Sequence, residues 1–375
     1  MRKRDAVTKH TKRGDRMMRG LSLLATMLLL AVFARAQSQA PNSANGRPPQ
    51  GAPPAQQNPP PIIVRTPTVI VPVTVKDSKG QLVGDLQRDE FRVFADGIEQ
   101  PISGFSAEAV PLSAVVLIDN DLAERNASQV QRSLTTIAAG FGPADEVALV
   151  TYDQFPKTVA DFSFNNDQLF TKLKRLELSS HNPQVIADPT TAGPIVSGKP
   201  QAPGSTVQVH GSQRYKNTNA LNDALFASGE MLKSRGRDRR KIIFLISDGS
   251  NSRQNEHSFD ETIRSLLSGD IAVYSISVTR SIPVGRAILQ RGASEVDKYA
   301  TDTGGDTFFA SKQRDLERLY SSVTEQARNQ YTLTFSPQDI PKNQDYHPIE
   351  VRVRRPDLNI TARHGYYASA ISAGH

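Results

Sequence analysis

The central part of the chain alternates short apolar runs with amphipathic segments. Apolar runs without polar alternation are typical of strands that are buried on both faces of a sheet. Such runs occupy residues 113–118, 147–152, 241–247 and 271–278. The intervening segments carry apolar residues three or four positions apart, which predicts helices at residues 126–141, 167–176, 218–233, 259–267, 284–301 and 314–328. Strands that alternate with helices predict a doubly wound, mostly parallel α/β sheet over residues 110–328.

The segments on either side of this region follow the two-residue period of half-buried strands. Residues 68–75 before it and 331–335 after it are examples, and Asp96-Gly97 is a β-hairpin signal. Neither flank is long enough to fold alone, and the two ends of a doubly wound domain often lie close together. We therefore expect residues 62–109 and 329–370 to pair into one small β-sandwich, between whose halves the α/β domain is inserted.

Residues 1–36 have the pattern of a signal peptide. Residues 1–20 contain eight Lys and Arg side chains but only two acidic ones, residues 21–33 are apolar, and Ala34-Arg35-Ala36 supplies small residues for cleavage. The apolar run is shorter than the roughly 20 residues that cross a bilayer, which favours cleavage after Ala36 over a membrane anchor. The signal peptide predicts an extracytoplasmic protein, either periplasmic or secreted, and we expect no membrane span after cleavage.

Composition adds three points. Residues 37–61 are rich in Pro and Gln and predict a disordered linker. The net charge of +7 comes largely from the signal peptide, and the basic cluster at residues 235–241 has no interleaved aromatic residues, so we do not expect nucleic-acid binding. We expect that cluster to complement a helix end. The absence of cysteine excludes disulfides, thiolate metal sites and thiol nucleophiles.

Polar side chains follow two of the predicted buried strands. Asp119 and Asp121 come at the end of the first strand, Asp248 follows the strand at 241–247, and Thr218 stands at the start of a predicted helix. Ligands of doubly wound sheets bind outside the carboxyl ends of the strands. Carboxylate and hydroxyl oxygens are hard ligands that suit Mg²⁺, Mn²⁺ or Ca²⁺. The sequence therefore predicts a candidate divalent-cation site formed by these four residues.

The element order and the motifs ALNDAL and LISDGSN resemble a von Willebrand factor type A (VWA) domain over residues 111–327. The flanking segments VPVTVKDSKG and ITARHGYYA resemble those of secreted VWA-related proteins of Acidobacteria. The resemblance implies a VWA fold, a protein ligand and a metal-ion-dependent adhesion site. The pattern of that site is a D-x-S-x-S loop, a Thr and a second Asp.

On this sequence, Asp119, Thr218 and Asp248 take the positions of the first Asp, the Thr and the second Asp. Asp121 and Ala123 stand where the two serines are expected, which leaves two interpretations open. Three carboxylates could retain a cation strongly but attract a partner's carboxylate weakly. Alternatively, the metal site is degenerate and Asp121 caps the following helix.

Residues 179–217 form a second candidate for recognition. The stretch is long, rich in Pro, Gly, Ser and Gln, and without periodicity. Loops of this length inside compact domains are usually functional or disordered. Both interpretations stay open: a specificity loop for a partner, or a disordered insertion.

Common catalytic signatures are absent, including G-x-S-x-G, H-E-x-x-H and G-x-x-x-x-G-K-[ST]. We therefore predict a non-enzymatic protein–protein interaction or adhesion module. Its protein ligand would bind the loops around Asp119, Thr218 and Asp248 and the 179–217 loop. Two alternatives are a secreted divalent-metal hydrolase that uses the same carboxylates, and a structural envelope protein with a decayed metal site.

Overall fold

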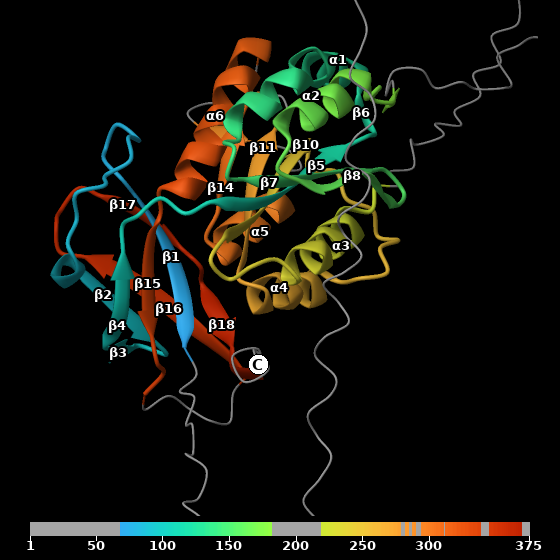
Figure 1. Cartoon of the computed structure of the whole chain (residues 1–375). Helices are drawn as coiled ribbons and strands as arrows, with labels where there is room; N and C mark the ends of the chain where they lie inside the picture. Colours follow the sequence, from blue (N-terminus) through green and yellow to red (C-terminus); the bar gives the residue numbers. More distant parts are fainter. Residues whose placement is uncertain are drawn as a thin grey trace, which may run out of the picture. The chain divides into compact units, whose positions relative to one another are not determined.

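The computed structural model describes residues 68–181, 219–278, 294–310, 312–338 and 345–369, together with two short strands at 282–284 and 287–289. They belong to one compact unit, Val64–His375 (Figure 1). The expected signal peptide, most of the 179–217 stretch and Thr218 lie outside the described residues. Within those limits, no helix is long and apolar enough to cross a membrane.

A six-stranded sheet forms the centre of the α/β domain, in the order β14-β11-β10-β5-β7-β8. All neighbours in it pair in parallel except β7 and β8, so the edge strand β8 is antiparallel. The prediction of a doubly wound, mostly parallel sheet is confirmed. The strands are β5 (Leu112–Asp119), β7 (Glu146–Tyr152), β8 (Pro156–Ser163), β10 (Arg240–Ser247), β11 (Ile271–Ser277) and β14 (Asp306–Phe309).

Helices cover both faces of this sheet (Figure 1). One face packs on α1 (Glu124–Ser133), α2 (Asn166–Arg175) and α6 (Gln313–Arg328). The other packs on α3 (Leu221–Lys233), α4 (Phe259–Ser268) and α5 (Ser294–Thr303). Strand β5 serves both cores, because Val116 and Ile118 face the first set of helices while Leu117 faces the second. Complete burial of each such side chain contributes about 1.5–3 kcal/mol, so this central strand is firmly anchored between the two helix layers.

Two predicted helices differ in the structure. The helix expected at 126–141 begins at Glu124, and from Leu134 to Gly140 it is a 3-10 helix. Thr135 and Thr136 are β-branched there, and the Thr136 hydroxyl bonds the Ser133 carbonyl at 2.6 Å. The prediction of a helix at 284–301 was wrong for the first half of that range. There, β12 (Ile282–Val284) and β13 (Ala287–Leu289) pair as antiparallel strands. Pro283 and the β-branched residues beside it favour this extended backbone.

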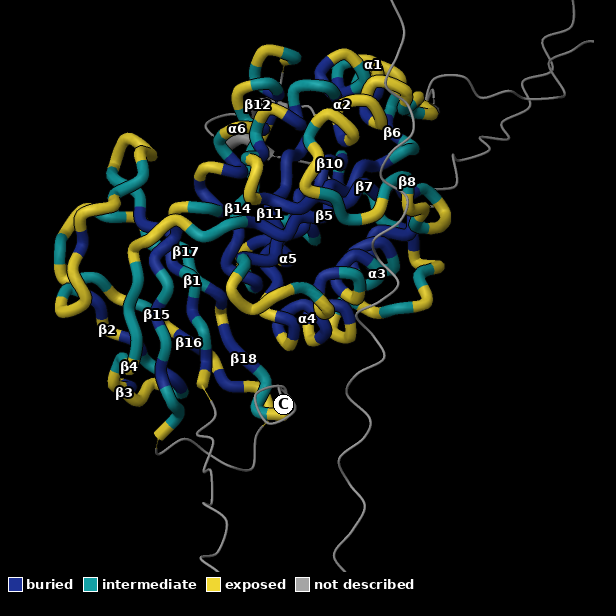
Figure 2. Tube along the Cα trace, in the orientation of Figure 1, coloured by how far each residue is buried: buried dark blue, intermediate teal, exposed yellow. Residues whose placement is uncertain are grey.

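The flanking segments build a β-sandwich, as the fold prediction required (Figure 2). Each of its two sheets mixes strands from both ends of the chain: Val71 in β1 pairs with Leu333 in β15, and Val93 in β2 pairs with Val351 in β16. One sheet has the order β17-β1-β15-β4, and the other β18-β16-β2-β3. The strands are β1 (Val69–Lys76), β2 (Phe91–Ala95), β3 (Ile98–Gln100), β4 (Ile102–Ser106), β15 (Tyr331–Phe335), β16 (Tyr346–Val353), β17 (Asn359–Ala362) and β18 (Gly365–Tyr367).

The basic cluster at 235–241 has a structural role. Arg240 is buried and donates to the carbonyls of Ala327 and Gln330 and to the Thr332 hydroxyl. It thereby joins the start of β10 to the end of α6 and to β15. Arg235 donates to the buried carboxylate of Glu146, with N–O distances of 3.0 and 2.6 Å. These contacts place the cluster at the amino-terminal edge of the sheet, away from the strand ends that carry Asp119 and Asp248.

Candidate functional site

The candidate site lies where the winding of the sheet changes direction. Strand β5 pairs with β7 on one side and with β10 on the other, so successive connections run outward in opposite directions from this point. Asp119 is the last residue of β5, and Asp248 directly follows β10. Connections that diverge from two adjacent strands leave a crevice at their carboxyl ends, and ligands of doubly wound sheets bind there.

Asp119 is the centre of the site, and its side chain is completely buried. Its Oδ2 accepts hydrogen bonds from Ser247 Oγ at 3.0 Å and from the Tyr152 hydroxyl at 3.4 Å. Its Oδ1 accepts from the backbone N–H of Asp121 at 2.9 Å. The side-chain amide of Asn219 donates to both oxygens, at 3.2 and 3.3 Å. Protein donors therefore surround the carboxyl group on both oxygens.

Burial also raises the pKa values of two side chains at this centre, Asp119 and Tyr152. Loss of solvent raises the pKa of Asp119 to about 8, and the nearby charges of Asp248 and Asp121 contribute in the same direction. Burial, followed by the charge of Asp119, raises the pKa of Tyr152 well above its ordinary value. The Tyr152 hydroxyl therefore stays protonated and acts as a hydrogen-bond donor, to Ser247 Oγ at 2.9 Å as well as to Asp119.

The loop after β5 is tied to its neighbours through Asn120. The backbone N–H of Asn120 donates to the Tyr152 carbonyl at 2.7 Å, and its side chain accepts from the Ser179 N–H at 2.9 Å. Directly after it, β6 (Leu122–Ala123) pairs in parallel with β9 (Ser180–His181). The first residues of the 179–217 stretch therefore lie beside the loop that carries Asp121.

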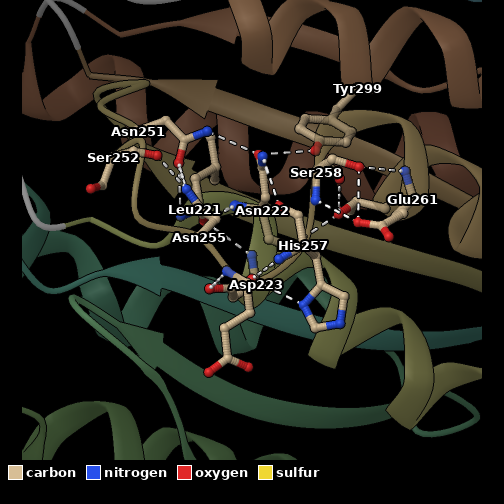
Figure 3. A network of polar contacts seen from close by, with 12 residues as sticks. Leu221, Asn222, Asp223, Asn251, Ser252, Asn255, His257, Ser258, Glu261 and Tyr299 are labelled. Atoms are coloured by element: carbon tan, nitrogen blue, oxygen red, sulfur yellow. Dashed lines mark hydrogen bonds and ion pairs between the residues drawn. The ribbon is translucent and has the colours of Figure 1, made fainter.

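The amino terminus of α3 is held by the loop that follows β10. Its own N-cap residue, Ala220, has no side chain that can cap the helix. Asn251 Oδ1 accepts from the Leu221 N–H at 3.2 Å, and Asn255 Oδ1 accepts from the N–H groups of Asn222 and Asp223 at 3.0 and 3.3 Å (Figure 3). These side chains satisfy helix amides that would otherwise lack partners. The loop and the helix are thus joined by a cap that comes from a distant part of the chain.

Side chains of α3 in turn accept hydrogen bonds from the loop that follows β10. The carboxylate of Asp223 in α3 accepts from the backbone N–H groups of Glu256 and His257, at 3.0 and 2.8 Å (Figure 3). The buried Asn222 side chain accepts from Asn251 Nδ2 at 2.9 Å and from the Tyr299 hydroxyl at 3.0 Å. The loop from 248 to 257 therefore has little freedom to move relative to α3.

An exposed aromatic side chain lies on the turn beside this site. Phe155, in the β7–β8 turn, is 71% exposed, the largest exposure among the large hydrophobic side chains of the described residues. The same turn touches two site loops, because the Ala220 N–H donates to the Asp153 carbonyl at 2.7 Å and Asn120 Nδ2 donates to Asp153 Oδ2 at 3.4 Å. Phe155 is therefore accessible beside the loops of the site, where an aromatic side chain could anchor a partner.

The structure brings three of the four predicted site residues together. Asp119, Asp121 and Asp248 are close enough for the last two to influence the pKa of the first. Thr218 lies outside the described residues, and the residue that contacts Asp119 from the start of α3 is its neighbour Asn219. The sequence interpretation missed Asn219, Ser247 and Tyr152. Asn219 could have been found from its position directly before ALNDAL. Ser247 and Tyr152 could have been found as the last residues of buried strands.

The surroundings of Asp119 and Ala123 bear on the predicted cation site, whose fourth residue, Thr218, lies outside the described residues. Both oxygens of Asp119 face protein donors, and the Ala123 side chain has no ligand atom. In the part of the chain that the structure describes, no group of three or more Asp, Glu or His side chains is arranged to hold a metal ion. For the alternative role of Asp121, the structure places this residue two positions before Ala123, the N-cap residue of α1, which begins at Glu124.

The α/β domain has a VWA-like fold, defined by the strand order and the two helix layers described above. No protein-family model and no curated protein sequence matches the chain. Three similar solved structures illustrate the range of its structural neighbours. The conserved hypothetical protein BatB from Bacteroides thetaiotaomicron is 12% identical, with a TM-score of 0.40; the match covers 58% of this chain and 98% of that one.

A von Willebrand factor type A protein from Catenulispora acidiphila is 7% identical, with a TM-score of 0.41, and the match covers 82% of this chain and 76% of that one. Proximal thread matrix protein 1 from the mussel byssus, in a structure with a zinc-occupied adhesion site, is 14% identical with a TM-score of 0.39. That match covers 62% of this chain and 49% of the mussel chain. At these identities the similarity concerns the fold, and the sequence resemblance to secreted proteins of Acidobacteria stays a prediction.

Proposed function

We propose that this chain is a non-enzymatic protein–protein interaction module that works outside the cytoplasm. Its partner binds the face formed by the loops after β5 and β10, the start of α3 and the β7–β8 turn. The observation that carries this proposal is the convergence of these four segments around the buried Asp119, at the point where doubly wound sheets bind ligands. The β-sandwich supports the α/β domain at the opposite edge of the sheet, through contacts such as those of Arg240.

In this proposal the partner contacts the side chains of this face directly, without a bridging cation. Phe155 supplies an exposed aromatic anchor, Asp121 and Asp248 supply carboxylates, and the 179–217 stretch begins beside them. The mechanism implied by the VWA resemblance would instead hold a divalent cation with Asp119, Asp121, Thr218 and Asp248. The hydrogen bonds around Asp119 favour direct recognition, because a cation at that carboxylate would have to displace the Asn219 and Ser247 donors.

A hydrolase is the less favoured function. Metal-assisted hydrolysis needs a general base beside the ion or its water. The described side chains that contact Asp119 are those of Ser247, Tyr152 and Asn219, and all three donate hydrogen bonds to it. Turnover of generic phosphoester or peptide substrates that disappears in Asp248→Ala would contradict the proposal and favour the hydrolase.

Export rests on the amino-terminal sequence pattern. Expression of the full chain with a bacterial secretion system should give a mature protein that begins at Gln37. Amino-terminal sequencing of the exported material checks this. An intact amino terminus on membrane-bound protein would instead favour the anchor interpretation.

Site-specific photo-crosslinking tests the binding face in the producing cell. A crosslinking amino acid at Gln154, which is exposed in the β7–β8 turn, should capture a discrete partner protein. The same group at Ile98, exposed in the β2–β3 hairpin of the sandwich, is the matched control and should not. Equal capture at both positions would contradict the assignment of the face. No capture from Gln154 or from Ser250 would favour a structural envelope protein.

A further inference from the structure

We propose that a hydrogen-bonded clamp holds the recognition loops in one arrangement without a divalent cation. The clamp consists of Asn219, Asn222, Asn251, Asn255 and Ser247. The adhesion site of the VWA resemblance uses a metal ion to organise the same loops, and in this chain amide and hydroxyl groups take over that task. The inference rests on the proposed function only for the idea that a partner uses these loops.

The first step concerns Asp119, which closes the clamp at the strand ends. Ser247 Oγ donates to Asp119 Oδ2 at 3.0 Å, and Asn219 Nδ2 donates to both oxygens of Asp119. The amide nitrogen that contacts Asp119 offers only protons, which cannot coordinate a cation. The Asn219 amide group is directed at Asp119, so the start of α3 is joined to β5 by a direct hydrogen bond.

The second step concerns the loop after β10. The Ser252 N–H donates to the Asn219 carbonyl at 2.7 Å, so the loop reaches the same residue that contacts Asp119. Asn251 and Asn255 then cap α3, and Asn255 Nδ2 donates to Asn251 Oδ1 at 2.9 Å. Asn222 is 6% exposed and completes the group by accepting from Asn251. A continuous path of hydrogen bonds thus links β5, α3 and the loop that carries Asp248.

The third step compares this path of hydrogen bonds with the cation that it replaces. A cation would organise the three loops by drawing their oxygen ligands to one point. Here the loops meet through directional hydrogen bonds to backbone amides and to a buried carboxyl group, which orient each loop without an ion. The Ala123 side chain offers no ligand atom, and among the described residues no cluster of three acidic or histidine side chains is arranged to hold a metal. The recognition face is therefore formed before any ligand arrives.

Calorimetry and thermal unfolding of the full mature chain test cation independence. Titration with Mg²⁺, Mn²⁺ or Ca²⁺ should give no saturable heat, and the unfolding temperature should be the same in EDTA and in millimolar cation. Saturable binding near one ion per chain, with a higher unfolding temperature, would overturn the proposal. This result does not depend on any partner, so a failure of the crosslinking experiment would leave it interpretable.

Hydrogen exchange tests the clamp itself. Asn255→Ala removes the cap on α3, and amide exchange should accelerate in peptides that cover residues 219–224 and 248–257, with no rescue by Mg²⁺. Gln254→Ala changes an exposed neighbour in the same loop and is the matched control. Equal exchange in the two variants would show that the clamp does not hold the loop. Slower exchange of the wild-type loop in Mg²⁺ would show that a cation does.

Discussion

Ser247 Oγ donates a hydrogen bond to Asp119 Oδ2 at 3.0 Å, and this contact joins the last residues of β10 and β5. The two residues lie 128 positions apart in the chain and on either side of the point where the sheet changes its winding direction. Ser247 Oγ also accepts from the Gly249 N–H at 3.0 Å, at a glycine with a φ of 81°. The same hydroxyl therefore orients the buried carboxyl group and the start of the loop that carries Asp248.

Removal of the central carboxyl group should destabilise the protein. In Asp119→Ala, the donors of Ser247, Tyr152 and Asn219 lose a buried acceptor, and we expect a loss of about 3 kcal/mol in the free energy of unfolding. Asp119→Asn keeps one acceptor oxygen but turns an N–H2 group toward protein donors, and should cost about 2 kcal/mol at pH 6, less than Asp119→Ala. Urea denaturation of the three proteins measures both values. Equal losses in the two variants would contradict the account of Asp119 as an acceptor.

The contribution of Asp119 to the stability of the folded protein should fall as the pH rises from about 4 to about 8. Burial raises the pKa of Asp119 to about 8, whereas the same group in the unfolded chain has a pKa near 3.9. Between these values the folded protein retains a proton that the unfolded chain has lost, so higher pH favours unfolding. The contribution of Asp119 is fully present below pH 4 and is lost through pH 8.

Urea midpoints at several pH values, compared between wild type and Asp119→Asn, isolate this group. The wild-type midpoint should fall relative to that of the variant as the pH rises, because the amide that replaces the carboxyl group in the variant does not titrate. Parallel curves for the two proteins would show that Asp119 is already ionised in the folded state at neutral pH.

Phe155 should contribute to partner binding without contributing to folding. Its side chain is 71% exposed, so Phe155→Ala should change the free energy of unfolding by about 0.5 kcal/mol or less. An aromatic anchor at the centre of an interface is worth about 2 kcal/mol or more, so affinity for the crosslinked partner should fall at least tenfold. Phe170→Ala, at another exposed phenylalanine, is the control. The role of Phe155 is refuted if both variants bind like the wild type.

Arg240 should be the most sensitive residue of the basic cluster. Arg240→Met leaves the buried carbonyls of Ala327 and Gln330 without a donor, and we expect a loss of about 3 kcal/mol. Arg237→Ala, in the same cluster but exposed, should stay within about 0.5 kcal/mol of the wild type. Chemical denaturation compares the two directly. Similar losses would indicate that the cluster acts through its overall charge rather than through this buried contact.

Most of the fold could be predicted from the sequence, because its strands and helices are encoded by residues that are close together in the chain. The alternation of Val116, Leu117 and Ile118 between two cores follows directly from an apolar run without polar interruption. The turn between β2 and β3 has positive φ values at Asp96 and Gly97, as the Asp-Gly pair predicts. The hairpin at 282–289 escaped prediction because a short apolar segment satisfies helical and extended spacing equally well.

The sequence by itself determined the α/β class, the flanking strands and the sheet edge at which Asp119, Asp121 and Asp248 gather. Only the tertiary structure decided what surrounds Asp119. Asn219 lies 100 residues from Asp119 in the chain, and its position before ALNDAL does not reveal that it contacts Asp119 until α3 packs against the strand ends. The capping of α3 by Asn251 and Asn255 is equally invisible in the sequence, because it depends on how the β10–α4 loop returns to the helix. Local periodicity encodes the elements, whereas side-chain partners at the strand ends depend on the packing of the whole domain.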